Sequence, residues 1–334
     1  WTIQTIKTAL ENEKGKNIFL QILFSRFSKE EAESVLQILR SELPNTKILG
    51  MSVYGDLVKN LNSKKFIRIN SIIFSQSHIT LMEYDNRFIK IEDMVKEFKS
   101  TLSSISDAKG VLLLGSGSTL KISSFVQEAS EGFENIHFFG TTASMNISDS
   151  YEPYVIGRKI IFRGIALAIF SGKELEIFSE SFFNWNPIGK SMEVHVSQPQ
   201  KRSSAFISMM DRARGLNLDT ENECEIGDTI VTTIDGLPAT QIYKKYLNVD
   251  PDSHFISNIC EFPLALERNG KIMARVPCGF NGKGEIFTIG DIKDGEKVRF
   301  TYAKTDELIQ KTSEESIQMA EFFPEAIFLF VCAN

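Results

Sequence analysis

The order of apolar runs and turns between residues 271 and 334 constrains the fold more than any other feature of this sequence. A short strand around Arg275, a glycine turn, a second strand, an Asp-Gly turn and a third strand follow one another. A helix then leads to an apolar strand over Ala326–Val331. An all-apolar strand is typical of a sheet that is covered on both faces. We therefore expect one part of a larger α/β to α+β protein, and a chain that continues beyond Asn334.

Length and composition indicate a globular chain with two parts. At one domain per roughly 150 residues, a chain of 334 residues suggests two domains. Hydrophobic residues make up 42% of the chain and include 26 Phe, which provides bulky material for a core. The net charge is -6, and the pair Lys201-Arg202 is too short to form a basic patch. These features exclude a nucleic-acid surface, because phosphate binding needs concentrated positive charge.

Cysteine spacing and hydropathy indicate a cytoplasmic protein. The four cysteines, at positions 224, 260, 278 and 332, have neither C-x-x-C nor zinc-ligand spacing, so we expect reduced thiols and no metal. No apolar run reaches the roughly 18 residues of a membrane helix, so we expect no membrane contact by this segment. The chain starts at Trp1 without a signal pattern, and we expect native sequence before it.

Strand and helix patterns alternate in the first half, and strands dominate later. Ser28 and Glu31 form a capping-box pattern at the start of a predicted helix. Consecutive strands are predicted over 154–157, 159–170 and 174–180, the last two joined by a hairpin turn. Residues 197–228 are polar and lack periodicity, which indicates an insertion. We predict two packed mixed-sheet parts with flanking helices: an α/β part over 14–236, and an α+β part over 237–334 that is truncated at its C-terminal end.

The loop Ser116-Gly117-Ser118 lies between a buried-strand run at 110–115 and a predicted helix. Glycines let backbone N–H groups approach a ligand, and a helix N-terminus favours an anion. The spacing does not fit a phosphate-binding P-loop, and no Gly-x-Ser-x-Gly nucleophile elbow can be aligned. Two interpretations stay open: a strand-to-helix turn with a serine cap, or a loop that faces a ligand.

Three other segments contain candidate binding residues. The small residues Gly140, Thr141 and Thr142 follow a predicted strand, and either line a polar pocket or form a tight turn. Arg275 interrupts an apolar strand, and is either a solvated edge residue or a clamp that holds a carboxylate with two hydrogen bonds. Cys332 ends the last apolar strand, as a buried thiol or as a reactive one.

No catalytic constellation can be assembled from the sequence. A nucleophile at Cys332 or Ser116 would need a base, and no triad is apparent, so we expect no enzyme. A haem-binding gas sensor is an alternative, because haem needs only one axial ligand and an apolar pocket; His137 and His195 lie within strand patterns. A protein-interaction scaffold is another alternative, which a large apolar surface patch would favour.

Several segments follow one another in a characteristic order: Ile48–Gly55, Phe138–Ala143, Phe183–Gly189, Ile234–Ala239 with Tyr243, and residues 271–334. Together they resemble the FIST domain family, the FIST N plus FIST C sensory input module of bacterial signal-transduction proteins. No single motif carries the resemblance, which covers nearly the whole chain. Two features depart from the family pattern. The insertion at 197–228 lengthens a link that is usually short, and Val331 replaces a serine that often precedes the terminal cysteine.

The resemblance implies a non-catalytic cytoplasmic sensor that binds a small molecule, with amino acids or related metabolites as proposed ligands. It also implies an output signalling domain of the diguanylate cyclase, histidine kinase or chemotaxis receptor type. Some relatives are haem-based nitric-oxide sensors. Because ligands favour domain interfaces and strand ends, we predict a site lined by the two small-residue loops and Arg275, with Cys332 included.

Overall fold

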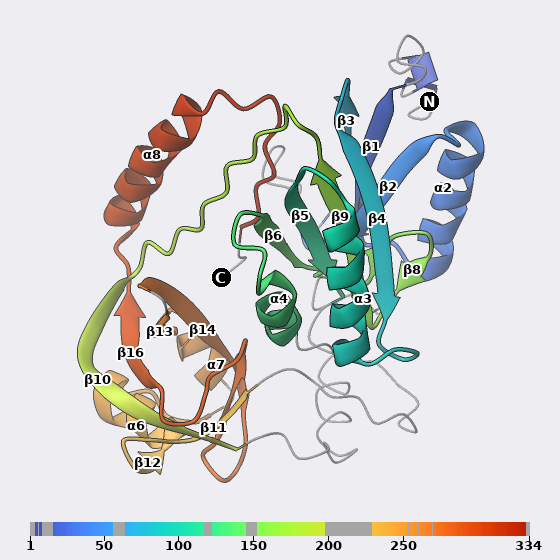
Figure 1. Cartoon of the computed structure of the whole chain (residues 1–334). Coiled ribbons are helices and arrows are strands. Elements are labelled where there is room, and N and C mark those ends of the chain that lie inside the picture. Colours follow the sequence, from blue (N-terminus) through green and yellow to red (C-terminus); the bar gives the residue numbers. More distant parts are fainter. Residues whose placement is uncertain are drawn as a thin grey trace. The chain divides into compact units, whose positions relative to one another are not determined.

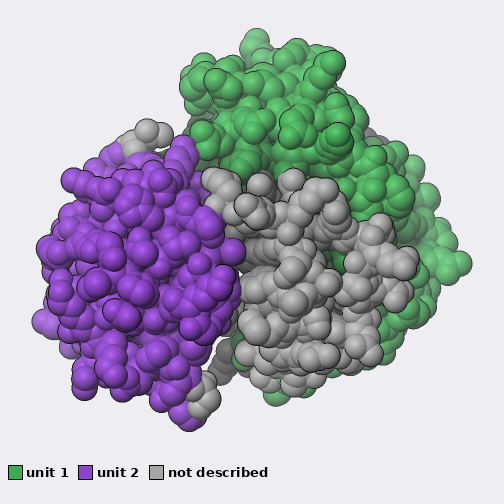
Figure 2. All heavy atoms as spheres, turned by 90° about the horizontal axis from the view of Figure 1, so that it is seen from below, with its two compact units in different colours: residues 1–179, 203–222 green, residues 180–202, 223–334 purple. Residues whose placement is uncertain are grey.

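The computed structural model describes residues 4–5, 7–8, 16–55, 64–116, 122–144, 152–197, 229–252, 254–259, 261–268 and 270–331. They form two compact units (Figure 2): unit 1 contains the described residues up to Ser179, and unit 2 contains those from Glu180 onward. Both units combine sheets with helices, which confirms the predicted α+β class. Residues 198–228, almost all of the predicted insertion, lie outside the described residues.

Unit 1 contains two mixed sheets (Figure 1). Their strand orders are β3-β1-β2-β7-β8 and β4-β9-β5-β6. The pairs β1–β2 and β5–β6 are parallel, and the other pairs are antiparallel. The strands of the first sheet are β1 (Asn17–Ser25), β2 (Thr46–Ser52), β3 (Phe66–Phe74), β7 (Val155–Ile156) and β8 (Ile160–Ile161). Those of the second sheet are β4 (His78–Asp85), β5 (Ala108–Gly115), β6 (His137–Thr142) and β9 (Gly164–Ser171).

The two sheets pack against each other, and helices cover their outer faces. On β1, the ring of Phe19 lies 5.6 Å from that of Phe170 on β9. The alternate residues Leu20 and Ile22 pack with α2 (Lys29–Glu42), which begins at the predicted capping box. Helices α3 (Ile91–Ser104) and α4 (Ile122–Ser130) cover the second sheet. Central strands are therefore buried on both faces, which explains their continuous apolar sequences.

Two predicted strands of unit 1 differ from those in the structure. The predicted strand 159–170 is divided, because β8 belongs to the first sheet and β9 to the second. The predicted strand 174–180 is wrong: these residues are in none of the described ladders. Strand β9 already pairs with β4 on one side and with β5 on the other, so it offers no edge to a hairpin partner. Gly140–Thr142, predicted as a loop, are the last residues of β6.

Unit 2 is built around a closed antiparallel barrel. Its sheet has the order β10-β16-β13-β14-β15-β11-β12, and β10 also pairs with β11, so that six strands form a ring and β12 lies outside it. A closed ring leaves its strands without free edges. The strands are β10 (Asn186–Ser197), β11 (Thr229–Ile234), β12 (Leu237–Pro238), β13 (Leu264–Arg268), β14 (Lys271–Phe280), β15 (Ile286–Ile289) and β16 (Lys297–Tyr302).

Two long strands turn the corners of this barrel. Strand β10 pairs with β16 as far as Glu193 and with β11 from Val194, and β14 pairs with β13 as far as Arg275 and with β15 from Val276. A register shift follows each change of partner, after His195 in β10 and after Pro277 in β14. Such bulges bend a strand. Arg275 therefore lies at a barrel corner.

Helices and the C-terminal segment complete unit 2. Helices α6 (Ala239–Leu247) and α7 (Phe255–Ile259) contribute Tyr243 and Phe255 to the barrel core. Helix α8 (Thr305–Glu321) has no buried residue and contacts Asn184 and Asn186 through polar side chains. The predicted strand 326–331 is in none of the described ladders. The barrel strands pair with one another on both sides, so they offer this segment no open edge.

Candidate functional site

The ends of β5 and β6 meet at one edge of unit 1. In this parallel pair Gly115 is in register with Thr142, and the Ala143 N–H donates to the Gly115 carbonyl at 2.6 Å. The carboxyl ends of two parallel strands therefore lie side by side. In α/β proteins this is the edge outside which ligands generally bind.

The segment after β6 also reaches the first sheet of unit 1. The Ser144 N–H donates to the Ser52 carbonyl at 3.0 Å, and the Ser144 Oγ accepts a hydrogen bond from the Tyr54 N–H at 2.9 Å. The Ser25 hydroxyl donates to the Tyr54 carbonyl at 3.5 Å. The ends of β1, β2, β5 and β6 thus gather in one place. We call this set the carboxyl edge: Ser25, Ser52, Ser116, Thr141, Thr142 and Ser144.

Ser116 uses its hydroxyl inside the protein. Its side chain is buried, and its Oγ donates to the Gly164 carbonyl at 3.1 Å while accepting the Gly164 N–H at 2.7 Å. The Ser116 N–H donates to the same carbonyl at 3.0 Å. Ser116 therefore connects the end of β5 to the start of β9. The next two predicted contacts, Gly117 and Ser118, lie outside the described residues.

Gly140 allows β6 to approach β5 closely. A Cβ at this position would lie 1.8 Å from the Leu113 carbonyl oxygen, and the φ angle of +148° favours glycine. Beyond it, Thr141 is half-buried, whereas Thr142 and Ser144 are exposed. The carboxyl edge therefore presents hydroxyl groups to solvent from the end of β6. Sequence reasoning named this loop but missed Ser25 and Ser52, which are the last residues of β1 and β2.

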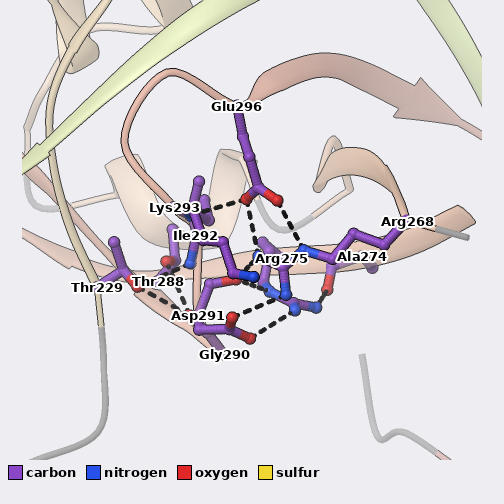
Figure 3. Close-up of polar contacts among 10 residues, drawn as sticks. All are labelled: Thr229, Arg268, Ala274, Arg275, Thr288, Gly290, Asp291, Ile292, Lys293 and Glu296. Atoms are coloured by element: carbon purple, nitrogen blue, oxygen red, sulfur yellow. Dashed lines mark hydrogen bonds and ion pairs between the residues drawn. The ribbon is translucent and has the colours of Figure 1, made fainter. Parts of the chain in front are cut away.

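Arg275 belongs to a network of four charged side chains in unit 2 (Figure 3). It donates to the Asp291 carbonyl through Nε at 2.6 Å and to the Asp291 carboxylate through Nη2 at 3.0 Å. Arg268 donates to the other Asp291 carboxylate oxygen at 2.7 Å, and to both Glu296 carboxylate oxygens at 2.7 Å. Two cations and two anions therefore neutralise one another. The carboxylate that Arg275 holds in this structure is that of Asp291.

The pKa shifts in the network follow from burial and from the charges of neighbouring side chains. Burial raises the pKa of the Asp291 carboxyl, but the hydrogen bond from Arg268 and the charge of Arg275 outweigh burial, so the pKa lies below its ordinary value. For Glu296, burial is likewise outweighed by the hydrogen bonds from Arg268, and the pKa is lowered. Burial lowers the pKa of Arg275, and the charge of Asp291 opposes this effect. Each carboxylate is therefore held in its ionised form.

A glycine turn places Asp291 in this network. Gly290 has a φ angle of +87°, and a Cβ there would lie 2.8 Å from Nε of Arg275. The Thr229 hydroxyl donates to the Gly290 carbonyl at 3.3 Å and accepts the Ile292 N–H at 2.9 Å, which fixes the turn (Figure 3). Sequence reasoning missed Asp291 as the partner of Arg275. The only local signal for this contact was the Gly290-Asp291 pair after a predicted strand, which is typical of a turn.

The two histidines considered as haem ligands have polar neighbours. His137 Nδ1 lies 2.7 Å from the Ser179 hydroxyl, and His195 Nδ1 lies 3.3 Å from Asp294 Oδ1. Within the described ranges, no three His, Cys, Asp or Glu side chains are grouped so as to hold a metal ion. Of the helices the structure describes, none has the length and apolar character needed to cross a membrane. Cys332 lies outside the described residues.

The two-part α+β architecture corresponds to two matches with protein-family models. The FIST N domain matches residues 19–202, and the FIST C domain matches residues 239–334. The chain therefore belongs to the FIST family, whose domains are sensory modules of signal-transduction proteins. No curated protein matches the chain. The FIST N match extends through β10, the strand that closes the barrel of unit 2.

Proposed function

We propose that this chain is a non-catalytic sensory domain that binds a small polar molecule, an amino acid or a related metabolite, at the carboxyl edge of unit 1. The observation that carries the proposal is the meeting of four strand ends, at which buried serines connect β1, β2 and β5 to the protein and the exposed residues Thr142 and Ser144 lie at the end of β6. Backbone groups and hydroxyls at such ends can fix the orientation of a polar ligand. Membership of the FIST family supports the sensory role.

The residues of the carboxyl edge have different parts in this proposal. Thr142 and Ser144, which are exposed, would contact the ligand, and Thr141 would lie beside them. Ser116 would act as a positioning residue, because its hydroxyl is engaged with Gly164. Gly117 and Ser118, which follow Ser116 in the chain, remain predicted ligand contacts, as does Cys332.

Arg275 is a separate candidate for binding a ligand carboxylate. Such a ligand would have to replace the carboxylate of Asp291, which Arg275 holds at 3.0 Å. Exchange of one carboxylate for another would couple ligand binding to the turn that carries Asp291. A conformational change of this kind, caused by ligand binding in the cytoplasm, would be transmitted to an output domain. The output domain would be of the diguanylate cyclase, histidine kinase or chemotaxis receptor type.

A thermal-shift screen of amino acids and small organic acids tests the proposal. A ligand present at 100 times its Kd stabilises the native protein by about 2.7 kcal/mol, which is readily detected. Thr142→Tyr should obstruct the carboxyl edge and abolish the shift, whereas Ser103→Tyr, at an exposed position of α3, should preserve it. The proposal fails if no compound shifts the transition, or if Thr142→Tyr responds like the wild type. The variant Arg275→Met separately tests whether Arg275 binds the ligand. Its transition temperature with a ligand is compared with its own transition temperature without one.

A further inference from the structure

Unit 1 also carries an exposed aromatic side chain between cations, outside the carboxyl edge. Phe88 lies in the turn from β4 to α3 (Figure 1), and 77% of it is exposed. The guanidinium carbon of Arg87 lies 5.3 Å from the centre of its ring, and Nζ of Lys159 lies 5.6 Å from it. Exposed single aromatic residues are common, but two cations close to the ring distinguish Phe88 from the still more exposed Phe323.

Arg87, and Arg158 next to Lys159 in the chain, are paired with carboxylates that are buried below the surface. Asp85, whose side chain is 3% exposed, accepts hydrogen bonds from Arg87 at 2.9 and 2.6 Å. Glu83, whose side chain is 9% exposed, lies 3.5 Å from Nε of Arg158 and also accepts the Arg158 N–H. By contrast, the side chains of Arg87 and Arg158 are 44% and 84% exposed. The anions are therefore recessed, and the surface formed by these groups is cationic and aromatic.

Two turns that are distant in the sequence make up this surface. Arg87 and Phe88 follow β4, whereas Arg158 and Lys159 lie between β7 and β8. Arg40 of α2 donates to the Gly157 carbonyl at 2.8 Å, which holds the second turn in place. Because salt bridges and backbone contacts fix both turns, a partner would not have to order them on binding.

We propose that Arg87, Phe88, Arg158 and Lys159, the cationic–aromatic patch, bind an acidic segment of a partner protein in which carboxylates flank an apolar side chain. Phe88 would pack on the apolar side chain, and the surrounding cations would bind the carboxylates. Aromatic and arginine residues dominate binding energy in protein interfaces, and charge complementarity selects the partner. Three cations are too few for the extended positive surface of a nucleic-acid site.

The test uses the full chain and a fluorescein-labelled peptide, Glu-Glu-Asp-Leu-Phe-Asp-Glu-Glu, with fluorescence anisotropy as the readout. A second peptide with Gln and Asn in place of the acids measures the contribution of charge. The variant Phe88→Ser/Lys159→Glu leaves both salt-bridged arginines in place. Its matched control is Phe323→Ser/Lys96→Glu, since Phe323 is 86% exposed and Lys96 is an exposed residue of α3.

We expect the acidic peptide to bind at least tenfold more tightly than the neutral one. The patch variant should lose at least tenfold in affinity, and the control variant should bind like the wild type. Raising the salt from about 50 to about 300 mM should weaken binding several-fold, because the Debye length falls. Equal binding of the two peptides, or an equal loss in both variants, would overturn the proposal. So would patch-dependent binding to phosphatidylglycerol vesicles without binding of the acidic peptide, which would identify a membrane surface instead.

Discussion

The substitution Asp291→Asn should destabilise unit 2 more than the partial exposure of the Asp291 side chain suggests. Asp291 is the carboxylate shared by Arg268 and Arg275, which donate to its two oxygens at 2.7 and 3.0 Å. The amide of asparagine removes the negative charge and directs an N–H₂ group at one of the two guanidinium groups. Arg268 keeps its two hydrogen bonds to Glu296, but Arg275 loses its only charged hydrogen-bond partner among the described side chains.

The size of the loss follows from the burial of each partner. Removing one member of a fully buried ion pair costs about 3–5 kcal/mol, because the remaining charge is left without compensation. The side chain of Arg275 is 11% exposed, but that of Asp291 is 30% exposed, so solvent screens part of the effect. The Asp291 carbonyl also stays bonded to Arg275 at 2.6 Å. We therefore expect Asp291→Asn to lower the free energy of unfolding by about 2–3 kcal/mol.

Urea titration monitored by tryptophan fluorescence measures this loss in unit 2 alone. The chain has two tryptophans, Trp1 and Trp185, and a Trp1→Phe background leaves Trp185, which belongs to unit 2, as the reporter. The control is Asp250→Asn, which removes an exposed carboxylate paired with Lys244 and should leave the transition unchanged. A loss below about 1 kcal/mol for Asp291→Asn would refute the argument that Asp291 compensates a buried arginine.

The same network makes a prediction about pH. The pKa values of Asp291 and Glu296 are lowered in the folded state, from ordinary values of 3.8 and 4.5. The unfolded chain therefore binds protons more readily, and the stability from both groups is complete above about pH 5. This stability is lost as the pH falls from the ordinary pKa values towards the lower pKa values that Asp291 and Glu296 have in the folded state. Asp291→Asn should have a shallower fall in stability below pH 5 than the wild type, and an equal slope would contradict the assignment.

Three further substitutions test single structural roles by urea titration. Tyr243→Phe should raise the free energy of unfolding by about 1 kcal/mol, because the hydroxyl is buried and has no hydrogen-bond partner among the described residues; a loss would indicate a bound water. Ser116→Ala should cost about 1–3 kcal/mol, because it leaves the Gly164 N–H without its acceptor, and a neutral result would remove the proposed link between β5 and β9. Gly140→Ala should destabilise unit 1 far more than Gly132→Ala. Both glycines have positive φ, but a Cβ at Gly132 meets no atom within 4 Å, so equal effects would refute the close approach of β6 to β5.

Local sequence signals were sufficient for most elements of the fold. The capping box at Ser28 and Glu31 and the apolar run of β5 depend on neighbouring residues, and both predictions are confirmed. Sheet membership depends on pairing between distant segments, which periodicity does not encode. The sequence predicted a strand over 174–180, but both edges of the adjacent β9 are occupied, so this segment forms no ladder with it.

The same distinction applies to the candidate site. Sequence reasoning named both the loop after β5 and the end of β6, and the parallel register of these strands brings Gly115 and Thr142 together. It also identified Arg275 as an unusual charge in an apolar strand. It did not identify Asp291, because that contact depends on the Gly290 turn folding back onto the barrel corner. An arginine in an apolar strand does not show from the sequence alone whether it is solvated or paired, or whether the chain or a ligand supplies its partner.

The positions of polar groups explain why we assign ligand binding to unit 1 first. In unit 2 the Arg268 and Arg275 charges already have internal carboxylates, and a ligand acid would have to compete with groups held at 2.7–3.0 Å within the same chain. Such competition is unfavourable, because the internal carboxylate is already positioned by folding. At the carboxyl edge, Thr142 and Ser144 are exposed, and a ligand would displace solvent there without breaking an ion pair. The first ligand contacts should therefore form in unit 1, and a response of Arg275 would require the Asp291 turn to move.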